Sequence, residues 1–508
     1  MTDSQENDGG IPASRRNKVG LVLGLIVFAI IEIAPAPSGL SSAGWHVAAV
    51  ASLIAIWWVT EAIPLSATAL LPLVLFPLLD VSSITDAAAP YANRVIFLMV
   101  GGFVIALGMQ RWNLHRRIAL SLVALTGGSP AGVIGGFMLA TAVISMWVFN
   151  TTTTVMMVPI ALSVIEFVRG GTADRPEHAQ AVKNFATALM IGIAYAATIG
   201  GMGTLIGTAP NAVLAAFMDE TYGIEVSFVE WMMVGVPMVI LMLPVVWLIL
   251  TKIAFPIDLP PVPGQTQMIR DQLTAMGPMS RGERTVAAVV AVTAVLWIFR
   301  PLINEAQPFV TLNDTSVALL AAVALFIIPV DLAKGTFALG GEWARKIPWG
   351  VVILFGGGLS LAGGIKSSGL ANWIGGATGG LLGLETIAVV FIVVILMILL
   401  TEITSNTATT ATFLPIVAAV AIGLGENPFL LLIPTVFAAS CAFMMPVATP
   451  PNAVVFGSGH IRIGQLIRAG IWANLAGAAI TMLVAYTVVR VVFGIELGVM
   501  PEWAAVAP

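Results

Sequence analysis

The feature that most constrains the fold is a pair of Asn-Thr clusters, each embedded in a long apolar stretch. The first, Phe149–Thr154, reads FNTTTT and is followed by Pro159. The second, Ser405–Thr410, reads SNTATT and is followed by Pro415, 256 positions after Pro159. Uncharged hydrogen-bonding groups that recur in apolar surroundings indicate a binding site built from two repeats.

A second motif is duplicated at a slightly shorter offset. Gly207–Asn211 reads GTAPN, and Ala448–Asn452 reads ATPPN, 241 positions later. The longer offset of 256 also carries Gly101-Gly102 onto Gly357-Gly358. The two halves of the chain therefore match at several separate places, which favours a repeat over a chance recurrence.

The surroundings of these motifs are those of a polytopic membrane protein. Of the 508 residues, 58% are hydrophobic and 9% charged, whereas soluble domains contain about 25% charged residues. Apolar stretches of about 20 residues can cross a bilayer. We expect an all-α protein with about eleven transmembrane helices and two re-entrant hairpins, at 118–168 and 382–424. The net charge of −4 and the lack of a long basic run give no indication of a nucleic-acid partner.

The distribution of basic residues predicts the orientation of the chain. We place the N-terminus in the cytoplasm and let both hairpins return to their starting side. The 22 Lys and Arg residues of the chain then divide unequally between the two sides of the membrane. All are cytoplasmic except Arg94, Arg300, Lys366 and Arg490, as the positive-inside rule requires. The two hairpins then enter from opposite sides. Inverted repeats of this kind are typical of alternating-access transporters with a site near the midplane.

The same reasoning predicts the domain organisation. The expected segments are a polar N-terminal tail (1–18), a first repeat (19–252), a cytoplasmic linker (253–284), a second repeat (285–493) and an external C-terminal tail (494–508). We expect a multi-pass protein of the plasma membrane, surrounded by lipid.

The residue types of the clusters favour the binding of an anion together with a small cation. Asn150 is a good N-terminal cap for a helix beginning near Thr152, and such a helix directs free N–H groups at an anion. Amide and backbone oxygens suit a hard cation such as Na⁺. The alternative is simple contact between helices through Asn and Thr, which the duplication disfavours.

Two further features have a structural as well as a functional interpretation. The Pro-Asn motifs interrupt their helices and free backbone carbonyls; a lone proline kink is usually structural, but two matched ones favour a site. Glu402 is an ionisable residue in an apolar run, which suggests function. It is equally compatible with a partner for Asn or Thr groups of the scaffold, and both interpretations stay open.

At these residues the chain resembles the divalent anion/sodium symporter family, whose members transport dicarboxylates, citrate or sulfate. The resemblance covers nearly the whole chain after the N-terminal tail. The motifs that carry it are Thr401–Thr407 (TEITSNT), Val447–Ala453 (VATPPNA), Ser145–Trp147 (SMW) and Gly207–Asn211. It implies a homodimer in which a mobile transport domain moves in an elevator fashion against a scaffold.

The resemblance also implies roles for individual residues. The first sodium site would use Ser145, Asn150 and the backbone at Gly207, and the second would use Thr401, Thr404, Asn406 and the backbone at Ala448. The substrate carboxylates would meet Asn150, Thr151, Ser405, Asn406 and Thr407, with Thr208, Thr449 and Pro451 lining the pocket. Sodium would be the coupling ion, with no other cofactor.

The chain departs from the family pattern at Phe149, where a serine is expected. Either the ring packs elsewhere and a backbone oxygen replaces the missing hydroxyl, or the pocket and the ion stoichiometry differ.

The function that the sequence predicts is Na⁺-coupled symport of a small dicarboxylate such as succinate, fumarate or malate. An exchanger of dicarboxylate, citrate or sulfate is the alternative. Exchangers often use a basic side chain in place of a cation, and the sequence predicts none near the hairpin tips. An intramembrane enzyme is disfavoured because the four histidines and Cys441 show no catalytic or metal-ligand pairing. Inverted, interrupted hairpins likewise favour a transporter over a channel.

Overall fold

The computed structural model describes residues 15–125, 129–172, 175–261, 264–377 and 385–505. Most of the tail predicted at 1–18, and the last three residues of the tail at 494–508, lie outside these ranges. The described chain is almost entirely helical. Its one sheet is a short antiparallel pair, β1 (Pro329–Asp331) and β2 (Thr336–Phe337), with Pro329 opposite Phe337.

Within the described residues, nine helices are long and apolar enough to cross a membrane. Two of them, α9 (Asn150–Gly171) and α20 (Asn406–Gly423), begin at the clusters and are hairpin arms. Shorter or broken helices complete the remaining crossings. Counted with broken helices as one crossing each, the spans are α1 (Arg15–Ile33), α2 (Ser42–Thr60), α3 (Leu65–Thr68) with α4 (Leu71–Leu78), α6 (Arg94–Arg111), α10 (Ala179–Gly201) with α11 (Ala209–Tyr222), α12 (Phe228–Leu248), α14 (Arg281–Ala306), α15 (Asp314–Ile327), α17 (Trp349–Ser367), α21 (Phe429–Ser440) with α22 (Pro450–Gly457), and α23 (Ile463–Val484). The predicted fold class is confirmed.

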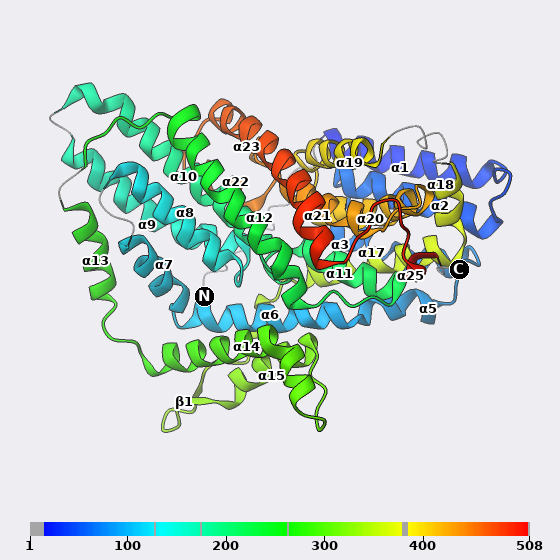
Figure 1. Ribbon diagram of the computed structural model, residues 1–508, viewed down its shortest axis with the longest axis horizontal. Coiled ribbons are helices and arrows are strands. Elements are labelled where there is room, and N and C mark those ends of the chain that lie inside the picture. Colours follow the sequence, from blue (N-terminus) through cyan, green and yellow to red (C-terminus); the bar gives the residue numbers. More distant parts are fainter. Residues whose placement is uncertain (1–14, 126–128, 173–174, 262–263, 378–384, 506–508) are drawn as a thin grey trace, which may run out of the picture.

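The two hairpins lie in opposite halves of the molecule (Figure 1). The first consists of α8 (Pro130–Ser145) and α9, and the second of α19 (Thr386–Thr401) and α20. The stretch predicted as the first hairpin also contains most of a separate helix, α7 (Leu114–Ala124). The predicted linker contains α13 (Gln265–Ala275) and the first turn of α14.

The helices that meet near the centre of the molecule begin there for local reasons. The residues before α9 and α20, Phe149 and Ser405, have extended backbone angles and end the turns at the hairpin tips. Helices α11 and α22 each begin with a proline in the first turn, after an extended threonine. Proline is favoured there because the first N–H groups of a helix have no partner within it.

One prediction about this region is wrong. Asn150 is not the cap of α9: it is the first helical residue, and the cap position belongs to Phe149, whose side chain cannot bond the helix end. The helix therefore begins two residues earlier than expected, with Asn150 and Thr151 already helical. The amide of Asn150 is thereby directed toward the end of α8.

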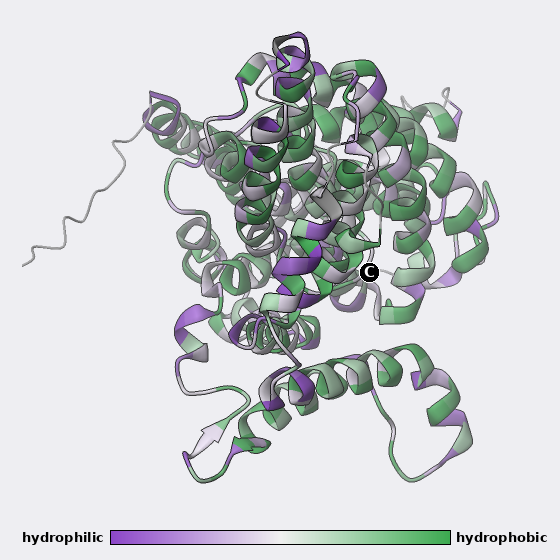
Figure 2. Cartoon of the chain, turned by 90° about the vertical axis from the view of Figure 1, so that its left-hand side faces the viewer, coloured by the Kyte–Doolittle hydropathy of each residue, from purple (hydrophilic) through white to green (hydrophobic). Residues whose placement is uncertain are grey.

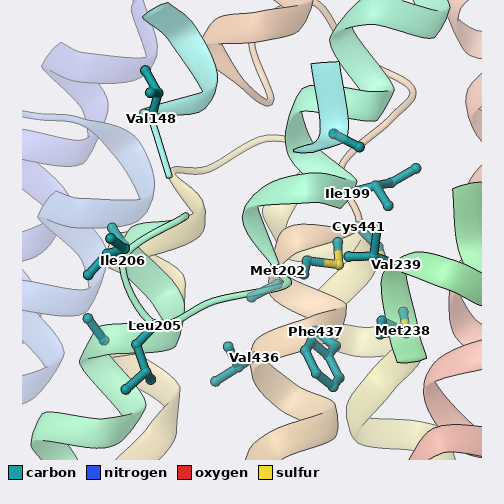
Figure 3. Packing of buried hydrophobic residues seen from close by; sticks show 14 of the residues in the cluster. Val148, Ile199, Met202, Leu205, Ile206, Met238, Val239, Val436, Phe437 and Cys441 are labelled. Carbon is teal, nitrogen blue, oxygen red and sulfur yellow. The ribbon is translucent and has the colours of Figure 1, made fainter. Parts of the chain in front are cut away.

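The helices pack closely beside the interruption between α10 and α11. A Cβ on Gly200 of α10 would lie 2.2 Å from the backbone oxygen of Ala142 in α8, so only glycine permits this approach. Buried apolar residues of α10, α12 and α21 gather around the two helix interruptions, between α10 and α11 and between α21 and α22 (Figure 3). Hydrophobic residues also run along most of the helices (Figure 2), and many of the large ones are exposed, as lipid-facing side chains are.

Candidate functional site

A cavity of about 520 Å³ lies between the two hairpin tips and the starts of α11 and α22. Four helices, α9, α20, α11 and α22, have their N-terminal residues in its lining. Their free N–H groups and positive dipole ends make the cavity favourable for an anion. All eight residues predicted to contact substrate line it: Asn150, Thr151, Thr208, Ser405, Asn406, Thr407, Thr449 and Pro451.

Several hydroxyl groups of this lining are available to a ligand. Those of Thr151, Thr208, Ser405 and Thr407 make no hydrogen bond with any other residue that the structure describes. The hydroxyl of Thr449 instead accepts a hydrogen bond from the backbone of Asn452, at 3.3 Å. A carboxylate entering the cavity therefore meets free donors on both hairpins.

The predicted first sodium site forms a compact cluster of polar atoms. Ser145 Oγ lies 2.7 Å from Asn150 Oδ1. The same end of the amide lies 3.1 Å from the backbone oxygen of Gly207 and 3.2 Å from that of Ala197. With its nitrogen turned inward, Asn150 would donate to both carbonyls. With its oxygen inward, the amide, a hydroxyl and two carbonyls converge, a set of neutral oxygen ligands that suits a hard cation.

The predicted second sodium site is only partly assembled in the same way. Thr401 Oγ1 lies 2.6 Å from Asn406 Oδ1 and 2.7 Å from the backbone oxygen of Ala439. Ala448 lines the cavity nearby. Thr404, by contrast, bonds the backbone oxygen of Leu400 at 2.8 Å and the Thr409 hydroxyl at 2.5 Å. Thr401 and Asn406 are therefore brought together, and the Thr404 hydroxyl is engaged elsewhere.

The asparagines of the Pro-Asn motifs have a role that the sequence analysis missed. Asn211 Nδ2 donates to the backbone oxygens of Gly201 and Thr204, at 2.9 and 2.7 Å. In the second repeat, Asn452 Nδ2 donates to the oxygens of Ala442 and Met445, both at 3.1 Å. Each asparagine reaches carbonyls ten and seven residues before it and so fixes the loop ahead of its helix. The sequence feature that could have predicted this role is the Asn that ends both motifs.

Glu402 supports the second interrupted helix. Its two oxygens accept hydrogen bonds from the backbone N–H groups of Phe443, Met444 and Met445, at 2.8 to 3.1 Å, and from Asn474 Nδ2, at 2.7 Å. The residue is 3% exposed. These contacts favour the structural interpretation, because the loop held by Glu402 carries Ala448. Its counterpart in the first repeat, 256 positions earlier, is Met146.

Phe149 belongs both to the packing and to the site. Its ring meets the buried ring of Phe103 in α6 edge to face, with centroids 5.1 Å apart. The residue also lines the central cavity. It lines a second cavity, of about 290 Å³, on the side of α6.

The prediction that no basic side chain lies near the tips is wrong. Arg16 Nη1, at the start of α1, donates to the backbone oxygen of Ile403 in the second tip, at 3.0 Å. Arg16 Nη2 also lies 3.7 Å from Oε1 of Glu61, which lines the cavity. Lys346 lines the second cavity beside Phe149. Both cations are far from the tips in sequence, so only the folded chain brings them close.

The described chain is similar to known transporters over most of its length. The family model described as the sodium:sulfate symporter transmembrane region matches residues 15–495. Sodium-dependent dicarboxylate transporters of Staphylococcus aureus strains USA300 and NCTC 8325 are each 41% identical over 488 residues, which cover 96% of this chain and 94% of theirs.

Two solved structures share the fold at low sequence identity. The YdaH transporter of Alcanivorax borkumensis, described as having an unusual topology, has a TM-score of 0.57 and 17% identity, covering 95% of this chain and 99% of its own. MtrF of Neisseria gonorrhoeae, described as one of a class of antimetabolite efflux pumps, has a TM-score of 0.56 and 13% identity, covering 93% and 96%. The family and these relatives are transporters, not enzymes, as the sequence predicted. The chain belongs to the sodium:sulfate symporter family.

Proposed function

We propose that the protein takes up a small dicarboxylate such as succinate, fumarate or malate together with Na⁺. The relatives at 41% identity are sodium-dependent dicarboxylate transporters. The observation that carries the proposal is the central cavity, in which four helix N-termini and free hydroxyls from both hairpins adjoin two groups of neutral oxygens.

Each carboxylate of the substrate has a matching set of donors. One carboxylate would meet Asn150 and Thr151 at the first tip, and the other would meet Ser405, Asn406 and Thr407 at the second. Thr208, Thr449 and Pro451 would form the walls. A fixed distance between the tips would then favour dianions of a matching length over monocarboxylates, because a monocarboxylate leaves one set of donors unpaired.

Sodium would compensate the charge of the substrate. A cation beside Ser145, Asn150 and the carbonyl of Gly207 would draw the Asn150 oxygen inward and leave the amide nitrogen for the carboxylate. A second cation beside Thr401, Asn406 and the backbone of Ala448 would act in the same way. Burying a dianion without such compensation is costly within a membrane.

Several contacts bear on an elevator movement of the hairpins against a surrounding scaffold. Glu225 accepts hydrogen bonds from Arg94 at 3.0 Å and from Arg300 at 2.6 Å. Glu225 lies in the turn between α11 and α12, whereas Arg300 belongs to α14. Burial alone would raise the pKa of Glu225, but the hydrogen bonds and charges of Arg300 and Arg94 hold its pKa below the ordinary value. Sliding of α11 and α12 past α14 would have to break this cluster.

Replacing Glu225 by glutamine is expected to speed transport if this cluster holds the resting state. Partly exposed ion pairs contribute roughly 0.2–1 kcal/mol each, and Glu225 makes two of them, so the maximal rate of uptake should rise by about 2- to 30-fold. The measurement is the initial rate of succinate uptake into proteoliposomes at saturating sodium. Glu305→Gln is the control, since Glu305 is exposed and has no ionic partner in the described chain. An unchanged or lower rate for Glu225→Gln would mean that the cluster does not restrain the movement.

The arrangement in the membrane is part of the same proposal. The cavity is lined on one side by Glu61 and Pro348, next to segments that the distribution of Lys and Arg assigns to the cytoplasm. This form would therefore release substrate inward, in a plasma-membrane protein with a cytoplasmic N-terminus. We further propose that it works as a homodimer.

The test of the proposed function is uptake of radiolabelled succinate by proteoliposomes. An inward sodium gradient should increase the initial rate at least tenfold over a potassium control. Preloading with unlabelled succinate should not replace the gradient. If uptake required internal dicarboxylate and ignored sodium, exchange would replace symport, and Arg16 or Lys346 would be the first candidates for the cation.

A further inference from the structure

The second cavity adjoins the substrate cavity at a single aromatic ring. Phe149 and Pro348 are the residues that line both. The ring of Phe149 is held in place by Phe103, which is 6% exposed. The ring of Phe149, together with Pro348, therefore lies between a space of about 520 Å³ and one of about 290 Å³.

The second cavity has the chemistry of a carboxylate site with an apolar approach. One face of α6 provides Phe103 and, two turns further on, Gln110; Thr152 faces it from α9. The side chains of Gln110 and Thr152 make no hydrogen bond with other described residues. Lys346 lies in the same lining, and its 3.3 Å contact with Glu342 joins two side chains that are more than half exposed. Such exposed pairs are weak, so the ammonium group is available to an anion.

We propose that Phe149 limits the length of the dicarboxylate, and that the second cavity is a carboxylate subsite which the ring separates from the substrate cavity. The inference rests on the proposed function. A four-carbon dianion fits between the two hairpin tips and does not need the subsite. With the ring removed, a longer α,ω-dicarboxylate extends from the tips past position 149. Its far carboxylate then meets Lys346, Gln110 and Thr152.

The test is competition by unlabelled succinate, adipate and suberate against uptake of radiolabelled succinate, in the wild type and in Phe149→Ala. Suberate should inhibit the wild type weakly. In Phe149→Ala its inhibitory concentration should fall about tenfold or more, because each buried methylene adds about fourfold in affinity. Lys346→Gln, added to Phe149→Ala, should reverse about tenfold of this gain, since it removes a charged hydrogen-bond partner.

Two further variants make the outcome decisive. Phe97→Ala removes an exposed ring from α6, the helix that carries Phe103, without touching either cavity, and it should leave the inhibition pattern unchanged. Phe149→Leu keeps an apolar side chain and tests the idea if Phe149→Ala fails to fold; it should show a smaller gain for adipate.

The possible results separate the two proposals. Failure of the wild type to take up succinate would overturn the proposed function. Succinate uptake by the wild type with no gain for suberate in either Phe149 variant would overturn the length limit. If inhibition by suberate stayed as strong in Phe149→Ala with Lys346→Gln as in Phe149→Ala alone, the carboxylate subsite would be overturned.

Discussion

Replacing Gly201 by alanine is expected to weaken sodium binding strongly without unfolding the protein. A Cβ at this position would lie 2.5 Å from Asn150 Oδ1 and 2.9 Å from its Nδ2. The amide must therefore move away from Ser145 and from the carbonyl of Gly207. Losing an interaction with a charged ligand costs about 1.5–3 kcal/mol, so the sodium concentration for half-maximal uptake should rise about 10- to 100-fold.

The glycines of this region provide matched comparisons. A Cβ on Gly457 meets no atom within 4 Å, so Gly457→Ala should leave uptake unchanged. A Cβ on Gly207 would lie 2.5 Å from the backbone oxygen of Gly201, which cannot give way as a side chain can. Gly207→Ala should therefore lower thermal stability as well as activity. If Gly201→Ala showed normal sodium dependence, the Asn150 amide would not be a sodium ligand.

Replacing Glu402 by alanine is expected to destabilise the protein strongly. Three backbone N–H groups and the Asn474 amide would lose their acceptor in a buried site. A buried polar group left without a partner costs about 1–3 kcal/mol, so the loss should reach at least ~3 kcal/mol. The apparent Tm in detergent should fall by several degrees, measured beside Glu385→Ala, whose exposed side chain makes no cap bond.

Glu402→Gln, compared with Glu402→Ala, distinguishes the two interpretations of Glu402 that the sequence left open. A sodium-binding or proton-carrying carboxylate would alter coupling when replaced by glutamine and leave the Tm near that of the wild type. A structural carboxylate would lower the Tm in both variants, since the amide nitrogen of glutamine cannot accept from the loop. An unchanged Tm with altered sodium dependence would contradict the structural role.

Much of the geometry of the candidate site was predictable, because it follows from local helix starts and hydrogen bonds that occur in both repeats. Asn150 and Asn406 begin their helices at equivalent places, and Thr154 and Thr410 each bond the backbone oxygen of the asparagine four residues before, at 2.9 and 2.8 Å. The matching offsets were enough to place both tips at one cavity. The apolar stretches were likewise enough to predict the fold class.

The features that were missed depend on long-range packing. Arg16 reaches the second tip from 387 positions away, and no local pattern marks such a contact. Thr404 is a local exception: its hydroxyl bonds the backbone oxygen of Leu400, four residues before it, and the Thr409 hydroxyl, five residues after it. Whether the Phe149 ring packs or faces a ligand depended on the position of α6, and in the folded chain it does both.

The central claim is that two neutral oxygen clusters bind sodium and thereby complete one dicarboxylate site. The most direct measurement is equilibrium binding of radiolabelled succinate to the detergent-solubilised protein as sodium replaces potassium at constant ionic strength. We expect binding only in sodium, with a Hill coefficient that approaches two and falls toward one in Ser145→Ala and in Thr401→Val. Succinate binding of equal affinity in potassium, or a sodium dependence unaffected by both substitutions, would contradict the account.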